Sequence, residues 1–374
     1  MNLSTMFKIA SLRLACLILL LLSPWLWSAE AFSPPYRIAV VSSYHPEYTW
    51  SQATNQGLLA GLTDLGLLES PEEAETFTKN DQLSGKQLHM RKYWMDTKRK
   101  SSPEQIAESL DEVTAQLKAF DPHILLLGDD NATNYLGNYY LDTDLPVIFW
   151  GVNGTPVKYG LLQSADKPGH NVTGIYQANY HTDTINLLRE LSPTIKNVAI
   201  LSDDSTTGRS HAKAFQKALI EDHPALNLSG IVMTSDYTDW KMQVLKLHDK
   251  IDAFLVSSVY ALKESDQLVK HQEVIRWYLM NTNKPEAVAQ VNLVKDGLMA
   301  AVFDSPQKQG IETARMVGRL IFKGEKPAEM AAYAPAHGGY ILNQWRADLF
   351  GIQIKDNKFD FEVHEVFDTH VSIK

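Results

Sequence analysis

The sequence predicts an α/β protein made of two lobes, each with a parallel β-sheet, joined by hinge segments that cross between the lobes. Short continuous apolar runs, such as residues 37–42 and 124–127, are typical of strands that are buried on both faces of a parallel sheet. Amphipathic helices separate these runs, which is the order that right-handed β–α–β units produce. After residue 180 the same alternation begins again, so we expect a second lobe of the same architecture.

The first lobe is expected to contain four strands, at residues 37–42, 88–94, 124–127 and 147–150. Two of its helix starts carry the capping-box signature, in which a hydroxyl residue is followed three positions later by glutamine. These are Thr49 with Gln52 and Ser102 with Gln105. The polar and acidic residues 69–86 are expected to form a surface loop or excursion.

In the second lobe, strands are expected at residues 197–201, 231–234, 253–257 and 287–291, and a long helix at 264–280. Residues 298–303 and a helix at 311–322 follow, and we expect both to return to the first lobe. From Tyr340 onward the chain is expected to add strands to the second lobe. These expectations give an N-terminal lobe at 32–150 plus 299–324 and a C-terminal lobe at 151–298 plus 325–374.

Residues 1–31 are interpreted as a signal peptide. Lys8 and Arg13 precede an apolar run at residues 14–22, which is too short to span a membrane comfortably. Small residues at the positions that a signal peptidase reads place the cut after Ala31. The mature protein is therefore expected to be exported to the periplasm, and a retained membrane anchor is the alternative.

Composition narrows the classes of function. The 374-residue chain has 44% apolar and 21% charged residues, an ordinary globular balance. Its net charge is −9 and it has no basic block, so nucleic acid is not an expected partner. The one cysteine, Cys16, allows neither an intrachain disulfide nor a thiolate metal site. Without a metalloprotease, nucleophile-elbow or phosphate-loop motif, the sequence predicts no enzyme, no cofactor and no metal.

Candidate ligand contacts come from the loops that follow the expected strands and from the segment that crosses between lobes. In an open parallel sheet, ligands bind beyond the carboxyl ends of the strands, where loops and helix N-termini converge. The side chains there are hydroxyls, carboxylates and aromatics with almost no basic groups, which favours a small zwitterion or neutral polar ligand over a phosphate. The candidates are Ser43, Tyr44, Trp50, Asp129, Asp130, Asn131, Trp150, Asn153, Tyr176, Ser205, Thr206, Tyr260 and Asp304.

Several of these candidates have a structural alternative. Asp129 lies beside a helix start, where an aspartate is commonly an N-cap. Trp150 fits sheet packing as well as ligand stacking, whereas Tyr44 and Trp50 follow a buried strand at a loop tip with little core to join. In the ligand-binding interpretation, an aspartate holds a cationic group and the aromatics stack on the ligand. Ser205 and the following hydroxyl would hold a carboxylate at a helix N-terminus.

Five segments of the chain carry a resemblance to a known family. They lie at residues 144–153, 167–175, 188–193, 310–327 and 340–343, and include Leu-Pro-Val-Ile-Phe, Asn-Val-Thr-Gly-Ile and Phe-Lys-Gly-Glu-Lys-Pro. With them the chain resembles the substrate-binding proteins of ABC transporters with the periplasmic binding protein type I fold, in the group that includes proposed tryptophan and tyrosine binders. The resemblance implies two Rossmann-like lobes that close on a small solute, without a cofactor or catalysis.

The resemblance also implies ligand contacts at Tyr44, Asp130, Asn131, Asn153, Ser205 and Asp304. The chain departs from the family in its opening loop, residues 42–50, and in the pair Asp129-Asp130, where the family usually has small neutral residues. An aspartate pair favours an ammonium group, and the additional aromatics favour a flat or apolar portion of the ligand. We therefore expect an amino acid or a similar small amine or aromatic metabolite.

Three functions remain open at this point. The first is an exported, monomeric solute-binding protein that delivers its ligand to the membrane permease of an ABC transporter. The second keeps the fold but docks the closed lobes on a membrane sensor kinase. The third is a periplasmic hydrolase that uses an Asp/His site around Asp129 and Asp130.

Overall fold

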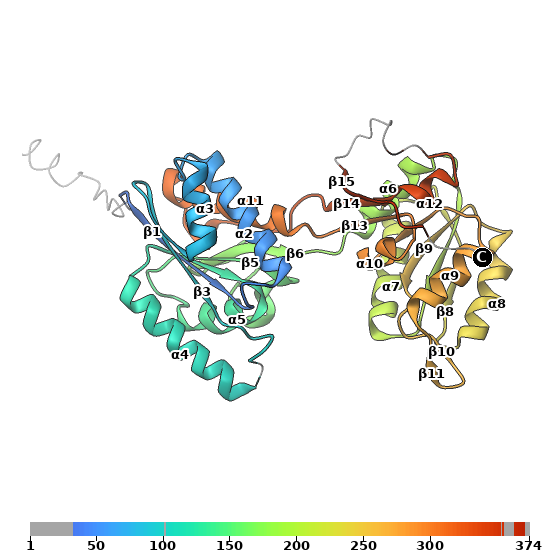
Figure 1. Ribbon diagram of the computed structural model, residues 1–374, viewed down its shortest axis with the longest axis horizontal. Coiled ribbons are helices and arrows are strands. Elements are labelled where there is room, and N and C mark those ends of the chain that lie inside the picture. The colour runs from blue at the N-terminus through green and yellow to red at the C-terminus, as the bar shows by residue number, and fades with distance from the viewer. Residues whose placement is uncertain (1–32, 101, 353, 355–362, 371–374) are drawn as a thin grey trace, which may run out of the picture.

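The computed structural model describes residues 33–100, 102–352, 354 and 363–370, and shows two lobes arranged along a long axis (Figure 1). The expected signal peptide at residues 1–31 lies outside the described residues. Within the described ranges, no helix combines the length and the apolar character needed to cross a bilayer.

The first lobe is built on a six-stranded sheet with the order β2-β3-β1-β4-β5-β6. All neighbouring pairs are parallel except β2 with β3. The strands are β1 (Tyr36–Ser42), β2 (Gln82–Ser84), β3 (Leu88–Trp94), β4 (Ile124–Gly128), β5 (Val147–Asn153) and β6 (Val172–Gln177).

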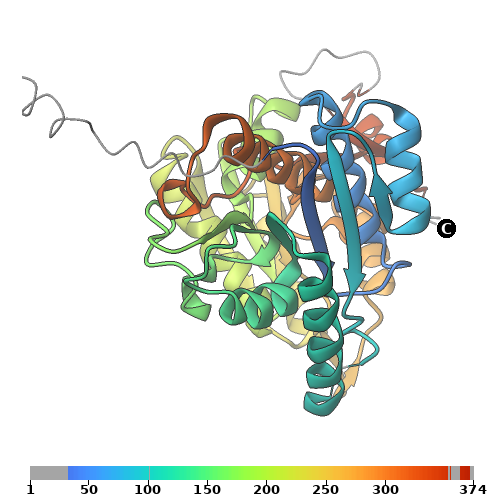
Figure 2. The ribbon, with the colours of Figure 1, turned by 90° about the vertical axis from the view of Figure 1, so that its left-hand side faces the viewer.

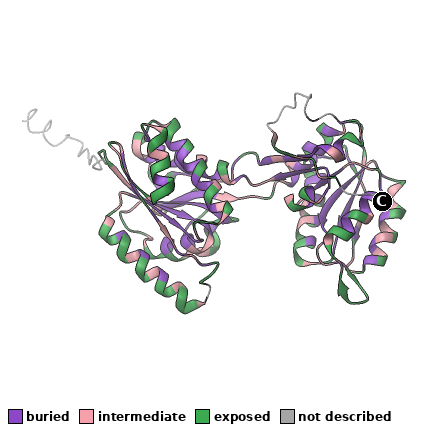
Figure 3. Cartoon of the chain, viewed as in Figure 1, coloured by how far each residue is buried: buried purple, intermediate pink, exposed green. Residues whose placement is uncertain are grey.

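Helices cover both faces of this sheet, as the continuous apolar strands require (Figures 2 and 3). Alternate residues of β1 show the division, since Ile38 and Val40 join one apolar cluster and Ala39 and Val41 the other. The first face carries α2 (Thr49–Asp64), α3 (Pro71–Asn80) and α11 (Pro306–Lys323). The second carries α4 (Pro103–Phe120) and α5 (Asp129–Tyr139). Short helical turns lie at η1 (Pro156–Tyr159) and η2 (Pro327–Glu329).

The second lobe has a seven-stranded sheet with the order β15-β14-β13-β12-β9-β7-β8, in which β13 and β14 are antiparallel. Its strands are β7 (Asn197–Ser202), β8 (Asn227–Met233), β9 (Ala253–Ser258), β12 (Glu286–Val288), β13 (Ala300–Phe303), β14 (Gly339–Asn343) and β15 (Val363–Phe367). Its helices are α6 (His181–Leu191), α7 (Thr206–Glu221), α8 (Tyr237–His248), α9 (His271–Asn281), α10 (Val291–Lys295) and α12 (Gln344–Asp348). A small hairpin is formed by β10 (Lys263–Glu264) and β11 (Gln267–Leu268).

The described part of the chain crosses between the lobes three times (Figure 1). The first crossing, residues 178–180, joins β6 to α6, and the second, residues 304–305, joins β13 to α11. The third follows Tyr333, which bridges to Ile175 in the first lobe, and reaches β14 in the second through residues 334–338. Two lobes joined by three hinge strands can change their separation with little change inside either sheet.

The expected placement of three segments differs from the observed topology. Residues 325–333 were expected in the second lobe, but Met330 joins a first-lobe apolar cluster and Tyr333 bridges to Ile175. Residues 151–177 were expected in the second lobe, but β5 runs on to Asn153 and β6 pairs with β5 in the first sheet. Residues 298–303 were expected to return to the first lobe, but β13 pairs with β12 and β14 in the second. An apolar run predicts a buried strand without indicating which sheet it joins, because pairing depends on distant partners.

Local expectations were confirmed in part. The capping box of Ser102 and Gln105 forms, and α11 packs on α2 in the first lobe as expected for the helix at 311–322. The capping box at Thr49 does not form, because α2 starts one residue earlier than the motif requires and Gln52 donates to the carbonyl of Pro46 instead. Residues 69–86 contain α3 and β2, and residues 264–280 contain a hairpin before α9.

Candidate functional site

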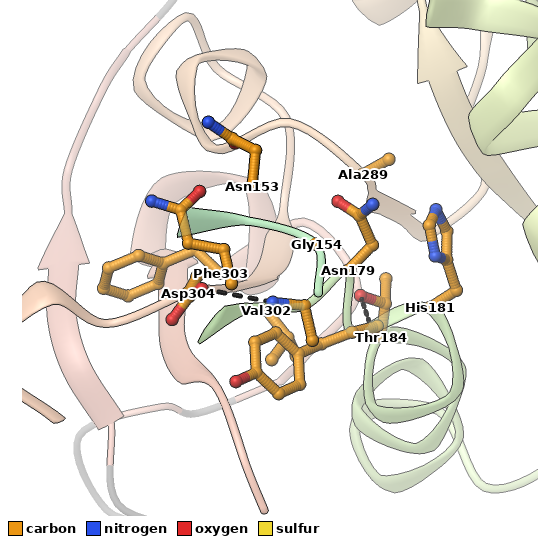
Figure 4. A pocket seen from close by; sticks show the side chains of 12 residues that line it. Asn153, Gly154, Asn179, His181, Thr184, Ala289, Val302, Phe303 and Asp304 are labelled. Carbon is orange, nitrogen blue, oxygen red and sulfur yellow. Dashed lines mark hydrogen bonds between the residues drawn. The ribbon is translucent and has the colours of Figure 1, made fainter. Parts of the chain in front are cut away.

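A pocket of about 440 Å³ opens between the lobes beside the crossing segments (Figure 4). It takes its lining from the end of β5, from the first crossing with the start of α6, and from the ends of β12 and β13. The residues are Asn153, Gly154, Gln177, Ala178, Asn179, Tyr180, His181, Thr184, Ala289, Val302, Phe303 and Asp304. Two of the predicted contacts, Asn153 and Asp304, are therefore pocket residues.

Asp304 and the buried Gln309 join the strand ends at the base of this pocket. The Asp304 carboxylate accepts hydrogen bonds from the backbone N–H of Ala178 (3.2 Å) and from Gln309 Nε2 (3.0 and 3.1 Å). Gln309 Nε2 also donates to the Tyr176 carbonyl (3.1 Å), and its Oε1 accepts from the Gly151 N–H (3.3 Å). Burial raises the pKa of Asp304 to about 6, against the effect of these donors. The hinge thus contains a carboxyl that titrates close to neutral pH.

The part of the second-lobe wall formed by the start of α6 is polar but neutral. His181 begins α6, and its Nε2 lies 2.9 Å from Nδ1 of His211 on α7. Burial, together with His211, lowers the pKa of His181 to about 4, so its ring is uncharged at neutral pH. The Thr184 hydroxyl donates to the carbonyl of Tyr180 (2.7 Å) within the same helix start. This wall offers hydrogen bonds without offering a charge.

Asp129 is the most perturbed acid of the first-lobe rim. It begins α5 and is only 2% exposed, and burial raises the pKa of its carboxyl to about 8. Its Oδ2 and the indole Nε1 of Trp50 are buried, and neither forms a well-aligned hydrogen bond in the described part of the chain. The indole nevertheless lies close enough to the carboxyl to lower its pKa against the effect of burial. Both groups crowd Gly151, where an added Cβ would lie 2.7 Å from Asp129 Oδ1 and 3.3 Å from Trp50 Nε1. The rim therefore holds a neutral carboxyl with unused hydrogen-bonding capacity.

Asp130, the next residue, is stabilised in its ionised form, in contrast to Asp129. Its carboxylate accepts hydrogen bonds from the Tyr159 hydroxyl (2.6 Å), from Asn153 Nδ2 (2.6 Å) and from Lys158 Nζ (3.3 Å). Although burial opposes them, these donors keep the pKa of Asp130 below its usual value. Because three donors already use the carboxylate, Asp129 is the acid better placed to interact with a ligand.

Tyr44, in the loop after β1, lies on this same rim with Trp50, which was expected at a loop tip but belongs to the first turn of α2. Burial raises the pKa of the Tyr44 hydroxyl, and the acids Asp129 and Asp130 add to the rise, which places Tyr44 beside both. The Tyr44 and Tyr48 rings meet edge to face with centroids 4.7 Å apart. The first-lobe rim thus combines aromatic faces with two carboxyl groups.

Four other first-lobe candidates make structural contacts. Ser43 Oγ donates to the Gly128 carbonyl (2.6 Å) and accepts from the Ala132 N–H (2.8 Å), which uses its capacity. Asn131 Nδ2 donates to Thr97 Oγ1 (2.8 Å). Trp150 is 3% exposed within the sheet core, and Tyr176 packs beside the opposite core cluster. The structure favours the packing interpretation of Trp150.

The second-lobe rim is organised by Asp203, directly after β7. Its Oδ1 accepts from the Ser205 N–H (3.1 Å) and hydroxyl (2.5 Å), and its Oδ2 accepts from Ser258 Oγ (2.7 Å) and the Ala261 N–H (2.9 Å). Burial opposes ionisation, but these donors lower the pKa of Asp203 below its usual value. The aspartate joins the loops after β7 and β9 and leaves no acceptor for a ligand.

The remaining second-lobe candidates are arranged around Asp203. Ser205 is the N-cap of α7, with its Oγ accepting from the Gly208 N–H (3.0 Å), and Thr206 is exposed at the first helical position. The Tyr260 ring lies 4.8 Å from the His271 ring and packs against the second-lobe core. Because Asp203 is ionised beside the α7 N-terminus, a ligand carboxylate is disfavoured there.

Most residues that line the pocket, and Gln309 beside it, were not predicted from the sequence. Residues 177–181 and Thr184 follow β6, and the lack of periodicity between that strand and α6 was the available signal. Gln309 lies inside the amphipathic pattern of α11, where a glutamine gives no indication of a buried hinge contact. Among the residues that the structure describes, no group of three or more potential metal ligands occurs.

The fold and the interlobe pocket define a two-lobe solute-binding protein with the periplasmic binding protein type I fold. A family model described as ABC transporter substrate binding protein matches residues 95–360. The chain therefore belongs to the family of ABC transporter substrate-binding proteins.

Several solved structures match the chain at low sequence identity, and the first of the three described below has the same fold. The ligand-free, open structure of a substrate-binding protein with adhesive properties from Clostridium difficile is 17% identical, with a TM-score of 0.63 over 89% of this chain and 99% of that one. An L-Trp complex from Streptococcus pneumonia is 19% identical, with a TM-score of 0.48 over 89% and 99% of the two chains. A periplasmic ribose ABC transporter structure from Conexibacter woesei is 12% identical, with a TM-score of 0.49 over 84% and 95%. No curated protein matches the chain.

Proposed function

We propose that the protein binds a small amine, an amino acid or a similar small aromatic metabolite between its lobes, without chemical change, and presents the closed form to an ABC transporter permease. The observation that carries this proposal is the first-lobe rim. A buried carboxyl and an indole N–H lie close together there without a well-aligned hydrogen bond, near the half-buried Tyr44 ring and next to the interlobe pocket. Buried polar groups are rarely left unpaired, so such a pair favours a ligand that satisfies both.

The charge of the rim favours an amine. Asp129 is neutral at pH 7 because its charged form is poorly solvated, and an ammonium beside it would supply the missing stabilisation and allow the proton to leave. Asn153 connects this rim with the pocket, since it holds Asp130 and also lines the cavity. An amine bound at Asp129 would thus have its remaining atoms directed toward Asn153 and the hinge pocket.

Closure of the two lobes on the ligand follows from the same geometry. A ligand that contacts both the first-lobe rim and the second-lobe wall at His181 stabilises the closed arrangement relative to the open one, and so shifts the equilibrium between them. A permease that recognises the closed form then receives loaded protein. No particular contact favours a membrane sensor kinase as the partner, so the permease is the proposal. We further propose that the mature chain is exported as a monomer.

The test is a ligand screen followed by a measurement of shape. Residues 32–374 would be screened by thermal shift against amino acids, biogenic amines and purines, and hits would be titrated by calorimetry. Small-angle scattering with a saturating hit is expected to show a smaller radius of gyration than the ligand-free protein. Trp50→Ala is expected to weaken the hit at least about ten-fold, because it removes an aromatic face and a buried donor. A Trp277→Phe variant serves as a control, since that ring belongs to the second-lobe core.

Two results would contradict the proposal. One is a bound ligand that leaves the scattering profile unchanged, which would exclude closure. The other is steady turnover of an ester, amide or phosphate substrate that Asp129→Asn abolishes, which would establish the hydrolase alternative.

A further inference from the structure

A lysine of the protein itself lies on the aromatic part of the first-lobe rim. Lys98 belongs to the loop after β3, and its Nζ is 4.4 Å from the Tyr44 ring centroid and 4.8 Å from the Tyr48 centroid. Both distances are within the range of a cation–π contact. The two rings form an edge-to-face pair, so one ammonium contacts both.

The same ammonium is electrostatically coupled to the rim acids. Lys98 is among the charges that favour ionisation of Asp129, and Tyr44 is coupled to both Asp129 and Asp130. Within the described residues, Lys98 forms no salt bridge and its ammonium donates no side-chain hydrogen bond, so the two rings are its direct contacts. It is an exposed side chain that the fold does not need for packing.

We infer that the Tyr44 and Tyr48 rings, with the buried carboxyl of Asp129 close to Tyr44, are the subsite for the ammonium of the ligand, and that Lys98 occupies this subsite until the ligand displaces it. The inference rests on the proposed function and adds to it the chemical class of the contacting group and a residue that sets affinity. Lys98 is a flexible cation on a tether, so its contact is reversible, and its exposed position lets it move to solvent.

The charges of the neighbouring groups support a cation rather than an anion in this place. An anion drawn to Lys98 would face the negative ring faces of two tyrosines and would lie near the carboxylate of Asp130. A ligand ammonium would keep the ring contacts that Lys98 now makes and, like Lys98, would favour ionisation of the nearby Asp129 carboxyl. The ammonium is therefore the group that this surface recognises.

The experiment uses two ligands with the same ring and opposite charge. Phenethylammonium and 3-phenylpropionate would be titrated into residues 32–374 by calorimetry, with wild type, Lys98→Gln and a matched control, Lys100→Gln. Lys100 is an exposed lysine of the same loop, and the control makes the same change in net charge. We expect Lys98→Gln to bind phenethylammonium about three- to ten-fold more tightly than wild type, because the internal competitor is gone. Lys100→Gln is expected to remain within about two-fold of wild type.

The inference is wrong if Lys98→Gln binds phenethylammonium with unchanged or weaker affinity, or if no variant binds it. It is also wrong if 3-phenylpropionate binds and loses affinity in Lys98→Gln, because Lys98 would then hold a carboxylate. A Lys98→Gln/Tyr44→Leu double variant is expected to lose the gain, which tests that the gain arises at the rings. If the expected tighter binding of phenethylammonium by Lys98→Gln is absent while a ligand from the general screen still lowers the radius of gyration, the subsite is refuted and the solute-binding function stands.

Discussion

One aspartate directly follows a buried strand in each lobe, and the two carboxyl groups have opposite charge states. Asp203 follows β7 and accepts four hydrogen bonds, so it is ionised although it is fully buried. Asp129 follows β4 and is nearly as buried, but its Oδ2 has no partner among the described residues and it is neutral at pH 7. The number of donors that the fold provides, rather than burial alone, decides the charge.

The two aspartates therefore have different roles, since Asp203 stabilises the structure and Asp129 remains able to bind a ligand. The second lobe uses its aspartate to hold two loops in place, which gives a preformed and rigid rim. In the first lobe the hydrogen bonding of Asp129 is incomplete, and Trp50 and the tyrosines lie around it. A solute therefore has more to gain by contacting the first lobe, and the second lobe supplies the neutral wall against which the protein closes.

Removal of the bonded aspartate is expected to have the largest effect on stability. Asp203→Ala leaves the donors of Ser205, Ser258 and Ala261 without their acceptor, and we expect a loss of about 3–5 kcal/mol in the free energy of unfolding of the second lobe. Hydrogen exchange of β7, β9 and α7 measures it, because the two lobes need not unfold together. First-lobe exchange serves as the internal reference, and a loss spread equally over both lobes would argue against a local anchor.

Asp129→Asn is expected to raise the stability of the folded protein. The folded-state pKa of Asp129 is raised to about 8 from 3.8, so between those values the folded protein holds a proton that the unfolded chain has lost. Stability therefore falls as pH rises through this window, and the amide removes that fall. We expect the variant to be more stable than wild type by about 3 kcal/mol at pH 8, with a smaller gain at pH 5, in denaturant unfolding.

Asp130→Asn is the matched control for this prediction. Its pKa is lowered, so the neutral amide should not stabilise the protein at any pH in the same series. If Asp129→Asn is destabilising from pH 5 to pH 8, then Asp129 is ionised in the folded state and the contrast with Asp203 fails.

A buried lysine beneath the same rim gives a third prediction. Lys92 donates to Asn55 Oδ1 (3.2 Å) and lies 4.0 Å from the Trp94 ring centroid, and burial lowers its pKa to about 8. Between this value and 10.5 the unfolded chain is protonated and the folded protein is not, so stability rises with pH there. Lys92→Met is expected to stabilise the first lobe by about 1–2 kcal/mol at pH 7, and the gain should disappear near pH 10. Lys86→Met, at an exposed lysine, should show neither effect.

The sequence predicted the part of the site that depends on sheet geometry. The loops after β1, β4 and β5 come together because parallel strands share one carboxyl edge, and β3 spans the expected residues 88–94. For the same reason Tyr44, Trp50 and Asp129 lie near one another.

The charge states and the hinge were not predictable in this way. The state of Asp203 depends on Ser258 and Ala261, more than fifty residues away, and nothing near Asp129 in the sequence shows that comparable donors are missing. Long-range pairing also decided the sheet of β13, and the buried role of Gln309 requires its contacts with Gly151 and Tyr176. These features arise from tertiary contacts, which local patterns do not encode.

A third aspartate, between the lobes, completes the comparison and gives the smallest expected effect. Asp304 has two donors, Ala178 and Gln309, and its pKa of about 6 lies between those of Asp203 and Asp129. Its folded-state pKa is raised from 3.8, so its contribution to stability falls as pH rises from about 4 to 6 and is constant above. Asp304→Asn removes this fall but loses an acceptor for its donors, so the net change in stability at pH 7.5 should be a gain of about 1 kcal/mol or less. It should also remove any difference in radius of gyration between pH 4.5 and pH 7.5 in ligand-free scattering, since the hinge would no longer change charge. A variant that keeps the wild-type pH dependence of both quantities would show that Asp304 does not titrate in this range, and that donor number does not order the three acids.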